Sequence, residues 1–123
     1  MAYDYVIVRI PGLRAGADLR ARQFHAVKPV SGGGMVDVVS AIDDDCIGIL
    51  YNKPAEGAAA EVAAGGILKG VAGGSIEAGK PVGFDASGQL VQSTTDQRQL
   101  VGYAVEPASA GQVFAFVWQR SRY

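Results

Sequence analysis

The feature that most restricts the fold of this chain is an internal repeat. Residues 45–62, DCIGILYNKPAEGAAAEV, and residues 99–118, QLVGYAVEPASAGQVFAFVW, share one order of apolar run, glycine, Pro-Ala turn, second glycine and second apolar run. Gly48 and Gly57 recur 54 positions later, and the Pro-Ala pair that begins at Pro54 recurs 53 positions later, as compensating one-residue insertions and deletions would produce. The repeat predicts a strand–turn–strand unit that is used twice.

The segments around the repeat predict further short strands. A hairpin over residues 23–41 precedes the first copy and a hairpin over residues 81–92 precedes the second, so that the two larger halves of the chain resemble each other. Glycine supplies 17 of 123 residues, a density that interrupts helices and suits turns and close strand crossings. About ten strands are expected, at residues 3–10, 23–30, 35–41, 46–51, 59–64, 67–71, 81–84, 89–92, 99–106 and 111–118. This pattern predicts an all-β fold, a compact β-barrel or sandwich with an extended N-terminal arm.

Residues 52–66, NKPAEGAAAEVAAGG, have two interpretations. Their alanines favour a helix by intrinsic propensity. The corresponding part of the second copy is strongly β-forming, because it contains Val113, Phe114 and Phe116. We follow the repeat and predict a turn at 53–57 with a short strand near 59–64.

The length of 123 residues and the mass of 12.7 kDa indicate a single domain. We divide it into an arm at 1–22, a β-barrel body at 23–118 and a C-terminal tail at 119–123. Residues 1–30 carry five basic and two acidic side chains, whereas residues 31–123 carry six basic and ten acidic ones. A basic arm on an acidic body suggests that the arm meets an acidic partner, although a chance excess on a solvated loop explains the charges equally well.

Composition argues against several classes of protein. The formal net charge of −1 gives no indication of direct nucleic-acid binding. The single cysteine excludes an intramolecular disulfide and does not support a zinc site. The first residues, MAYDYVIVRI, do not resemble a signal peptide, and no apolar run approaches the roughly 20 residues of a membrane helix. We therefore expect a soluble protein that is made in the cytoplasm and has no membrane partner.

The candidate catalytic residues are few. His25, the only histidine, could be combined with Ser87, Ser93 or Cys46 and with Asp85 into a hydrolytic triad. No nucleophile-elbow motif surrounds these residues, so a structural or surface role is the favoured interpretation of His25. Cys46 begins an apolar strand and is expected to be a buried, unreactive thiol. We predict no catalytic residue.

The candidate binding motifs are also weak. The three aspartates at 43–45 lack the alternating pattern of a calcium loop and predict a solvated turn. Lys69 lies in ILKG, which differs from the flanking residues of the hairpin lysine in lipoyl or biotinyl carriers, and a solvent-facing strand lysine is favoured. The glycines at 32–34 and 73–74 suit turns better than phosphate cradles, because no helix start and no GK[ST] follows them. The sequence predicts neither a metal nor a cofactor.

Five blocks of the sequence, in their order and spacing, carry a resemblance to a known family. The blocks are QFHAVKPV at 23–30, CIGILYNKPAEGAAAEV at 46–62, GILKGVAGGSIEAGKPV at 66–82, DASGQLV at 85–91 and LVGYAVEPASAGQVFAFV at 100–117. Together they resemble the small capsid decoration (cement) proteins of tailed bacteriophages. The residues before position 23 lie outside this resemblance.

The resemblance implies a structural protein of the virion that is not an enzyme and carries no cofactor. Such a protein is expected to be a compact β-barrel on the outer surface of the head, stabilising contacts between subunits of the major capsid protein at local two-fold or three-fold positions. It would associate with itself as a dimer or trimer. The arm and the C-terminal residues would be the adhesive segments. The interface residues that follow are Tyr3, Tyr5, Ile7, Arg9, Arg14, Arg20, Arg22, Trp118, Arg120 and Tyr123.

Two other functions stay open at this point. A soluble β-barrel binding module for carbohydrate or peptide would need a concave site with exposed aromatic rings, whereas the aromatic residues here fall mostly within strand patterns. A hydrolase would need His25 to be buried beside a serine or cysteine and a carboxylate.

Overall fold

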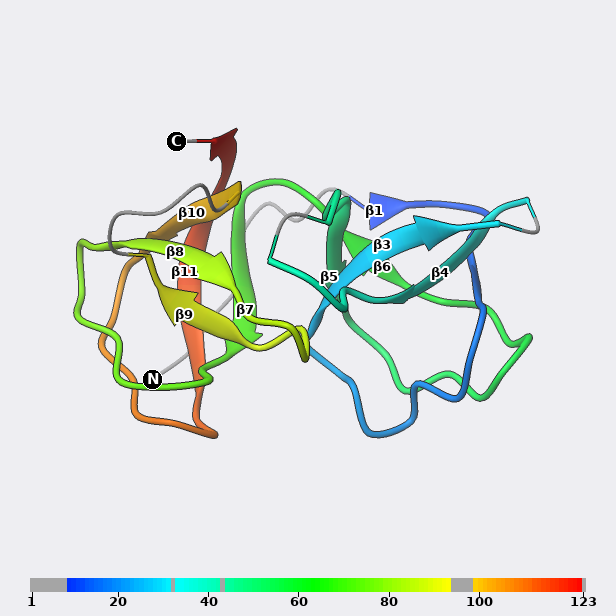
Figure 1. Ribbon diagram of the computed structural model, residues 1–123, viewed down its shortest axis with the longest axis horizontal. Coiled ribbons are helices and arrows are strands. Elements are labelled where there is room, and N and C mark those ends of the chain that lie inside the picture. Colours follow the sequence, from blue (N-terminus) through cyan, green and yellow to red (C-terminus); the bar gives the residue numbers. More distant parts are fainter. Residues whose placement is uncertain (1–8, 32, 43, 94–98, 123) are drawn as a thin grey trace.

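The computed structural model describes residues 9–31, 33–42, 44–93 and 99–122, and within them it contains eleven strands in two sheets and no helix. Figure 1 shows the two sheets side by side along the long axis of the molecule. The all-β prediction is confirmed. The alanine-rich stretch forms a turn followed by the short strand β6 (Val62–Ala63), so the repeat outweighs the helix propensity of the alanines.

The first sheet closes on itself. Its strand order is β1-β6-β5-β3-β4-β2. The bounds are β1 (Arg9–Ile10), β2 (Arg14–Ala15), β3 (Ala26–Val30), β4 (Met35–Val38) and β5 (Gly48–Leu50), with β6 as above. The edge strands β1 and β2 are consecutive parts of one segment that is interrupted at Pro11, where the chain has no N–H to donate. Because β1 pairs with β6 and β2 pairs with β4, this segment joins both edges, and we call residues 9–63 the first barrel.

The second sheet closes in the same way. Its strand order is β7-β11-β10-β8-β9. The bounds are β7 (Ile67–Val71), β8 (Pro81–Phe84), β9 (Leu90–Gln92), β10 (Gln99–Ala104) and β11 (Val113–Arg122). A parallel bridge joins Ala72, which follows β7, to Leu90 in β9, and the N–H of Gly73 donates to the Leu90 carbonyl at 2.7 Å. Closure leaves few unpaired edges, and we call residues 67–122 the second barrel.

The two barrels repeat the same backbone hydrogen bonds. Corresponding donor–acceptor pairs are Tyr51–Glu61 and Val105–Ala115, Leu19–Pro54 and Ile76–Ala108, and Gly16–Val36 and Gly73–Leu90. From the return strand of the hairpin onwards, corresponding residues of the two barrels are 54 positions apart in the sequence. Before the hairpin they are 57 positions apart. The predicted repeat is therefore confirmed and reaches further towards the N-terminus. The 53-position match of the Pro-Ala pair is corrected, because the carbonyl that corresponds to that of Pro54 belongs to Ala108.

The described part of the predicted arm is built into the first barrel. It supplies β1 and β2, and Ala15 and Leu19 are buried in the core. Any extension beyond the body is thus restricted to residues 1–8, which lie outside the described residues. At the other end, β11 runs through most of the predicted tail and ends at Arg122.

Alternate residues of the first sheet face two different cores. Leu50 and Val62 belong to the cluster inside the first barrel. Their neighbours Ile49 and Ala63 face outward, yet they are fully buried in the cluster that also fills the second barrel. The outer face of the first barrel is therefore covered by the second barrel.

Backbone and aromatic contacts fix this junction between the barrels. The N–H of Lys69 donates to the Tyr51 hydroxyl at 2.7 Å, and the N–H of Val71 donates to the Phe24 carbonyl at 3.2 Å. The rings of Phe24 and Tyr51 meet edge to face with centroids 5.2 Å apart, and the Lys69 ammonium lies 6.0 Å from the Phe24 ring centroid. Phe24 has a φ of 65°, a conformation that a non-glycine residue adopts only when its surroundings hold it there.

Candidate functional site

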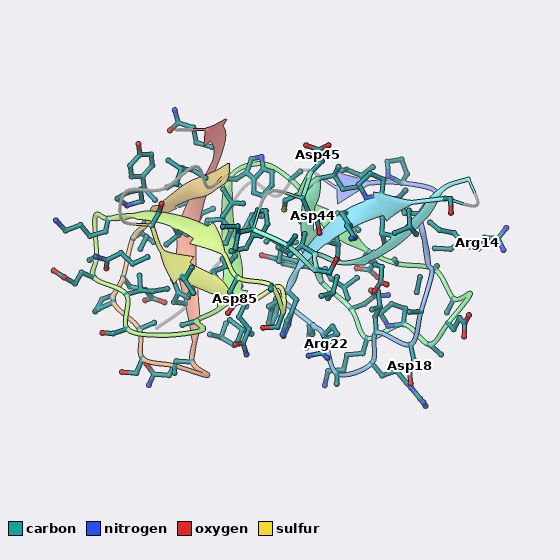
Figure 2. All side chains as sticks on the ribbon, in the orientation of Figure 1. Arg14, Asp18, Arg22, Asp44, Asp45 and Asp85 are labelled. Carbon is teal, nitrogen blue, oxygen red and sulfur yellow. The ribbon has the colours of Figure 1, made fainter. Side chains whose placement is uncertain are left out.

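The predicted interface residues do not form one site. Tyr3, Tyr5, Ile7 and Tyr123 lie outside the described residues. Arg9 and Arg120 belong to β1 and β11. Arg14, Arg20 and Arg22 are exposed on the N-terminal segment of the first barrel, whereas Trp118 is half-buried in the second barrel. Figure 2 shows Arg14 and Arg22 on the first barrel together with Asp18.

One of these arginines is engaged by its neighbour. The guanidinium of Arg20 donates two hydrogen bonds to the carboxylate of Asp18, each at 2.9 Å. This pairing raises the pKa of Arg20 and, mainly through the same side-chain hydrogen bonds, lowers the pKa of Asp18. Both groups are solvent-exposed, so the pair contributes little to stability. Arg14 and Arg22 have no such carboxylate partner within the described residues and carry the accessible positive charge of this segment.

His25 is buried, as a hydrolase would require, but its contacts are structural. Its Nδ1 lies 3.0 Å from the carbonyl oxygen of Gln23. The Ser87 hydroxyl donates to Asp85 at 2.9 Å, and among the described residues no hydrogen bond joins His25 to Ser87. Desolvation lowers the pKa of His25, and the nearby positive charge of Arg22 acts in the same direction. The imidazole, which donates from Nδ1 to the Gln23 carbonyl two residues earlier, therefore supports the turn at the junction.

The remaining candidates also have structural roles. The carboxylate of Asp44 accepts hydrogen bonds from the backbone N–H groups of Ser40 and Ala41 and from the Lys28 ammonium, at 2.8, 3.0 and 3.0 Å. The backbone hydrogen bond from Ser40, followed by that of the Lys28 side chain, lowers the pKa of Asp44. The carboxylate thus holds a turn together. Cys46 is buried. Lys69 is half-buried at the junction between the barrels, unlike the exposed hairpin lysine of a lipoyl or biotinyl carrier.

Within the described residues, no cluster of three or more histidine, cysteine, aspartate or glutamate side chains could hold a metal ion. No helix in the same residues is long and apolar enough to cross a membrane.

An exposed apolar face on β10 and β11 was missed by the sequence reasoning. Tyr103, Val105, Val113 and Val117 are 41%, 38%, 42% and 37% exposed, which makes them four of the five large apolar side chains that are exposed in the described chain. Tyr103 pairs with Val117 across the two strands, and the N–H of Val105 donates to the carbonyl of Ala115 on β11. Tyr103, Val105 and Val117 thus lie on the outer side of this strand pair, and Val113 lies further along β11, beyond the fully buried Ala115; we call these four exposed residues the β10–β11 face. Their alternation with buried residues was visible in the sequence, but both sets are apolar.

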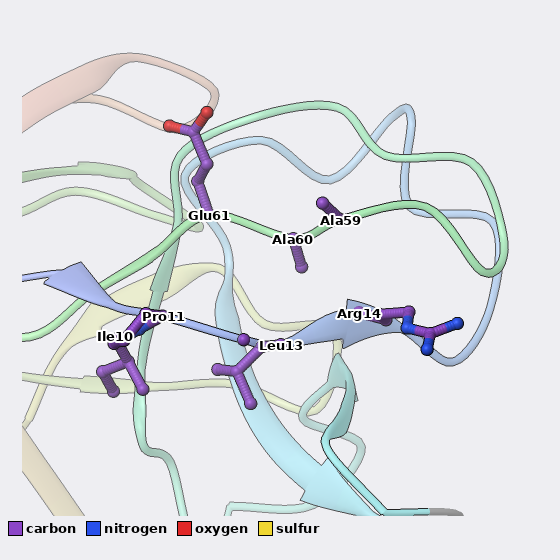
Figure 3. Close-up of a pocket in the computed structure, with 8 residues that line it drawn as sticks. Ile10, Pro11, Leu13, Arg14, Ala59, Ala60 and Glu61 are labelled. Atoms are coloured by element: carbon purple, nitrogen blue, oxygen red, sulfur yellow. The ribbon is translucent and has the colours of Figure 1, made fainter.

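A second surface feature is a pocket of about 480 Å³ in the first barrel. Figure 3 shows it between the segment Ile10–Arg14 (residues 10–14) and the strand approach at Ala59, Ala60 and Glu61. It exists because strand pairing is interrupted there: Ile10 pairs with Val62 and Arg14 bridges Ala59, which leaves one more residue on the Pro11–Gly12 side than on the other. In the second barrel the corresponding strands pair without interruption from Ile67 to Val71.

The lining of this pocket is mostly aliphatic. A smaller and more polar hollow of about 350 Å³ lies between residues 75–77 and 107–112. Neither lining contains an aromatic ring within the described residues, so neither offers the stacking surface expected of a carbohydrate site.

Comparison with known proteins finds a matching family and a solved structure with a similar fold. The family model described as phage cement protein matches residues 14–119, which include nearly all of both barrels. Among solved structures, the chain is similar to the N base of the head fiber gp8.5 of bacteriophage phi29, with a TM-score of 0.73 and 19% sequence identity over 96% of this chain and 98% of that chain. At this identity the likeness concerns the fold. No curated protein matches the chain.

Proposed function

Because the chain belongs to the phage cement protein family, a family with a capsid-decorating and stabilising role, we propose that it attaches to the outer surface of a phage head and binds neighbouring subunits of the major capsid protein. The observation that carries this proposal is the extent of the family match, which covers both barrels rather than one motif. The protein would be made in the host cytoplasm and then join the virion, where copies also contact one another.

The construction of the molecule supports a mechanical role. Two closed barrels joined by a buried junction form a rigid body, because backbone hydrogen bonds and apolar packing fix the junction. A rigid body that contacts several capsid subunits resists their separation, and many copies on one shell add weak contacts into strong attachment. Each stable contact would need to bury about 800 Å² per partner.

The attachment segments in this proposal are residues 1–8 and the exposed arginines Arg14 and Arg22 of the first barrel. Tyr3, Tyr5 and Ile7 alternate as β-formers do, and a segment of this kind can add a strand to a neighbour's sheet. Eight extended residues reach roughly 26 Å, enough to cross a subunit boundary. Arg14 and Arg22 add positive charge on the same barrel, which suits an acidic capsid surface.

Deletion of residues 1–8 tests the assignment of the arm. The shortened chain keeps β1 and both barrels and should unfold at the same temperature as the full chain. Heads assembled without the protein are mixed with each chain, sedimented and heated. The full chain should co-sediment and raise the temperature at which heads rupture, whereas the shortened chain should bind at least tenfold more weakly.

The controls separate the arm from the function itself. Full-length protein that fails to bind the heads would refute capsid decoration, whatever the arm does. Equal binding by the full and shortened chains would refute the arm and leave the barrels as the attachment surface. The double variant Arg14→Glu, Arg22→Glu should weaken binding further at low salt, and a variant of the already paired Arg20 should have less effect.

A further inference from the structure

The two barrels are built alike, but corresponding faces have different surroundings. With the 54-position correspondence, Ile49, Tyr51 and Ala63 of the first barrel correspond to Tyr103, Val105 and Val117 of the second. Ile49 and Ala63 are 0% exposed and Tyr51 is half-buried, because the second barrel covers them. Tyr103, Val105 and Val117 are 41%, 38% and 37% exposed. The β10–β11 face is therefore the uncovered equivalent of a face that is covered within the same chain.

Within the chain, β7 of the second barrel is the strand that contacts this face of the first barrel. The outward side of β7 contacts the first barrel through Lys69, whose N–H donates to Tyr51, and through Val71, whose N–H donates to Phe24. The first barrel's counterpart of β7 is the segment 9–14. Val71 pairs with Val113 in the second barrel, and Arg14 pairs in the same way with Ala59, the counterpart of Val113. That segment borders the pocket shown in Figure 3.

We propose that the β10–β11 face binds a second copy of this chain, through the segment 9–14 and the pocket beside it. The contact repeats between chains the arrangement that already joins the two barrels within one chain. It deepens the self-association in the proposed function and rests on that part of it, but it can be measured in solution without heads.

The pocket suits this contact sterically. In the second barrel, the backbone N–H of Lys69 meets the Tyr51 hydroxyl, and the Lys69 side chain extends to within 6.0 Å of the Phe24 ring centroid. In the first barrel the corresponding place is the bulge at Pro11 and Gly12, which has no long side chain and opens into the pocket. A small apolar side chain such as Val105, the counterpart of Tyr51, would therefore face an aliphatic hollow instead of a lysine.

The contact between copies uses side chains rather than inserted backbone. Within the chain, the N–H of Ala26 donates to the carbonyl of Gly88 at 2.8 Å. Backbone of the first barrel thus occupies a hydrogen-bonding position at the end of the second barrel. The corresponding end of the first barrel is already closed, because the N–H of Arg14 donates to the carbonyl of Gly34 at 2.8 Å. Without those backbone bonds and without the connecting chain, the contact is weaker than the internal junction and depends on protein concentration.

The geometry of this contact is head to tail. Each copy presents one β10–β11 face and one segment 9–14, which are different surfaces, so association produces rings or open chains rather than two-fold dimers. This distinguishes the proposal from self-association through a single self-complementary patch.

The test begins with sedimentation velocity of the full chain over a range of concentrations, with Val105→Glu and Val113→Glu as matched variants. Val113 belongs to the β10–β11 face and is as exposed as Val105, but its counterpart Ala59 stays exposed beside the internal junction, so the proposed contact involves Tyr103, Val105 and Val117 and leaves Val113 outside. The wild-type chain and Val113→Glu should associate equally as concentration rises, and Val105→Glu should require at least tenfold higher concentration. Tyr103→Lys serves the same purpose if Val105→Glu does not fold.

Mixing then tests the head-to-tail geometry. Arg14→Glu should impair the other surface and be monomeric alone. A mixture of Val105→Glu with Arg14→Glu should form one-to-one complexes by native mass spectrometry, because each variant retains the surface that the other has lost. Association of Val105→Glu at wild-type concentrations, or mixtures that stay monomeric while the wild type associates, would overturn the proposal. A wild type that stays monomeric, with Val105→Glu losing attachment to heads, would overturn it too and assign the face to the capsid protein.

Discussion

Gly102 and Gly48, the glycines that define the sequence repeat, mark places where two backbones approach too closely for a side chain. Gly102 lies in β10 between β8 and β11, at a φ of +154°, and a Cβ there would overlap the carbonyl oxygen of Val117. A Cβ on Gly48 would lie 2.7 Å from the carbonyl oxygen of Ala63 and 2.5 Å from Val62 Cγ1, with no unusual φ. Substitution should therefore be costly at both positions, and more so at Gly102.

The expected magnitude for Gly102→Ala combines two effects. A backbone conformation that alanine rarely adopts costs about 1–3 kcal/mol. Displacing the neighbouring strand costs a further ~1–3 kcal/mol, as overpacking does in other cores. The two effects sum to about 2–6 kcal/mol, and with roughly 3–5 °C per kcal/mol for a chain of this size the melting temperature should fall by about 6–30 °C. Gly48→Ala meets only the second effect, so a loss of about 1–3 kcal/mol is expected.

Gly57→Ala is the matched control, because Gly57 has a φ of +83° with nothing within 4 Å of the added Cβ. It measures the cost of the backbone conformation alone, about 1 kcal/mol. Thermal and urea unfolding followed by circular dichroism would rank the three variants. If Gly102→Ala melted within about 2 °C of Gly57→Ala, the close approach of β10 and β11 would not be what requires glycine, and the reasoning would fail.

Three further outcomes can be measured on the isolated protein. Since burial lowers the pKa of His25 below 6.5, the unfolded chain binds the proton more readily, so stability should fall as pH drops below about 6.5, and His25→Gln should remove this slope. Asp44→Asn should cost about 1–2 kcal/mol at pH 7; because the folded pKa is lowered from 3.8, this difference should be present above that pH and vanish as pH falls below the folded value. Tyr51→Phe should cost about 1 kcal/mol and speed amide exchange at Lys69, whose N–H loses its acceptor.

The strands of the second half were predictable because turn residues bound them closely. Ile67–Val71 and Pro81–Phe84 begin and end where the sequence indicates, since glycines or proline flank each run. The strand at 35–41 ends earlier than expected, at Val38: Val39 still donates a hydrogen bond to the Ala26 carbonyl, but Ser40 and Ala41 belong to the turn that Asp44 stabilises.

The closing strand of the first barrel was not predictable from local pattern. Pro11 and Gly12 interrupt it, so the segment resembles a loop although Ala15 and Leu19 are core residues. A signal was present in AGADL at 15–19, which recurs as AGGSI at 72–76, 57 positions later. Short matches of small residues gain meaning only once the hydrogen bonds show that both segments join the same two strands.

The exposure of the β10–β11 face was beyond sequence reasoning for a different reason. Ile49 and Tyr103 occupy the same place in their barrels, and both are apolar. Which of them is covered depends on the position of the neighbouring barrel, a tertiary fact that periodicity does not encode.

This asymmetry is also the strongest argument about how the molecule works. In a duplicated protein, the covered face must stay apolar, whereas its uncovered counterpart is free to become polar, and soluble monomers seldom keep contiguous apolar patches. Tyr103, Val105 and Val117 remain apolar at the positions that match the covered Ile49, Tyr51 and Ala63. A face that keeps the composition of a junction is best explained by a junction that forms later, when copies gather on a common surface. On a head shell, such contacts would connect neighbouring copies laterally, so that strain on one capsid subunit is shared by those around it.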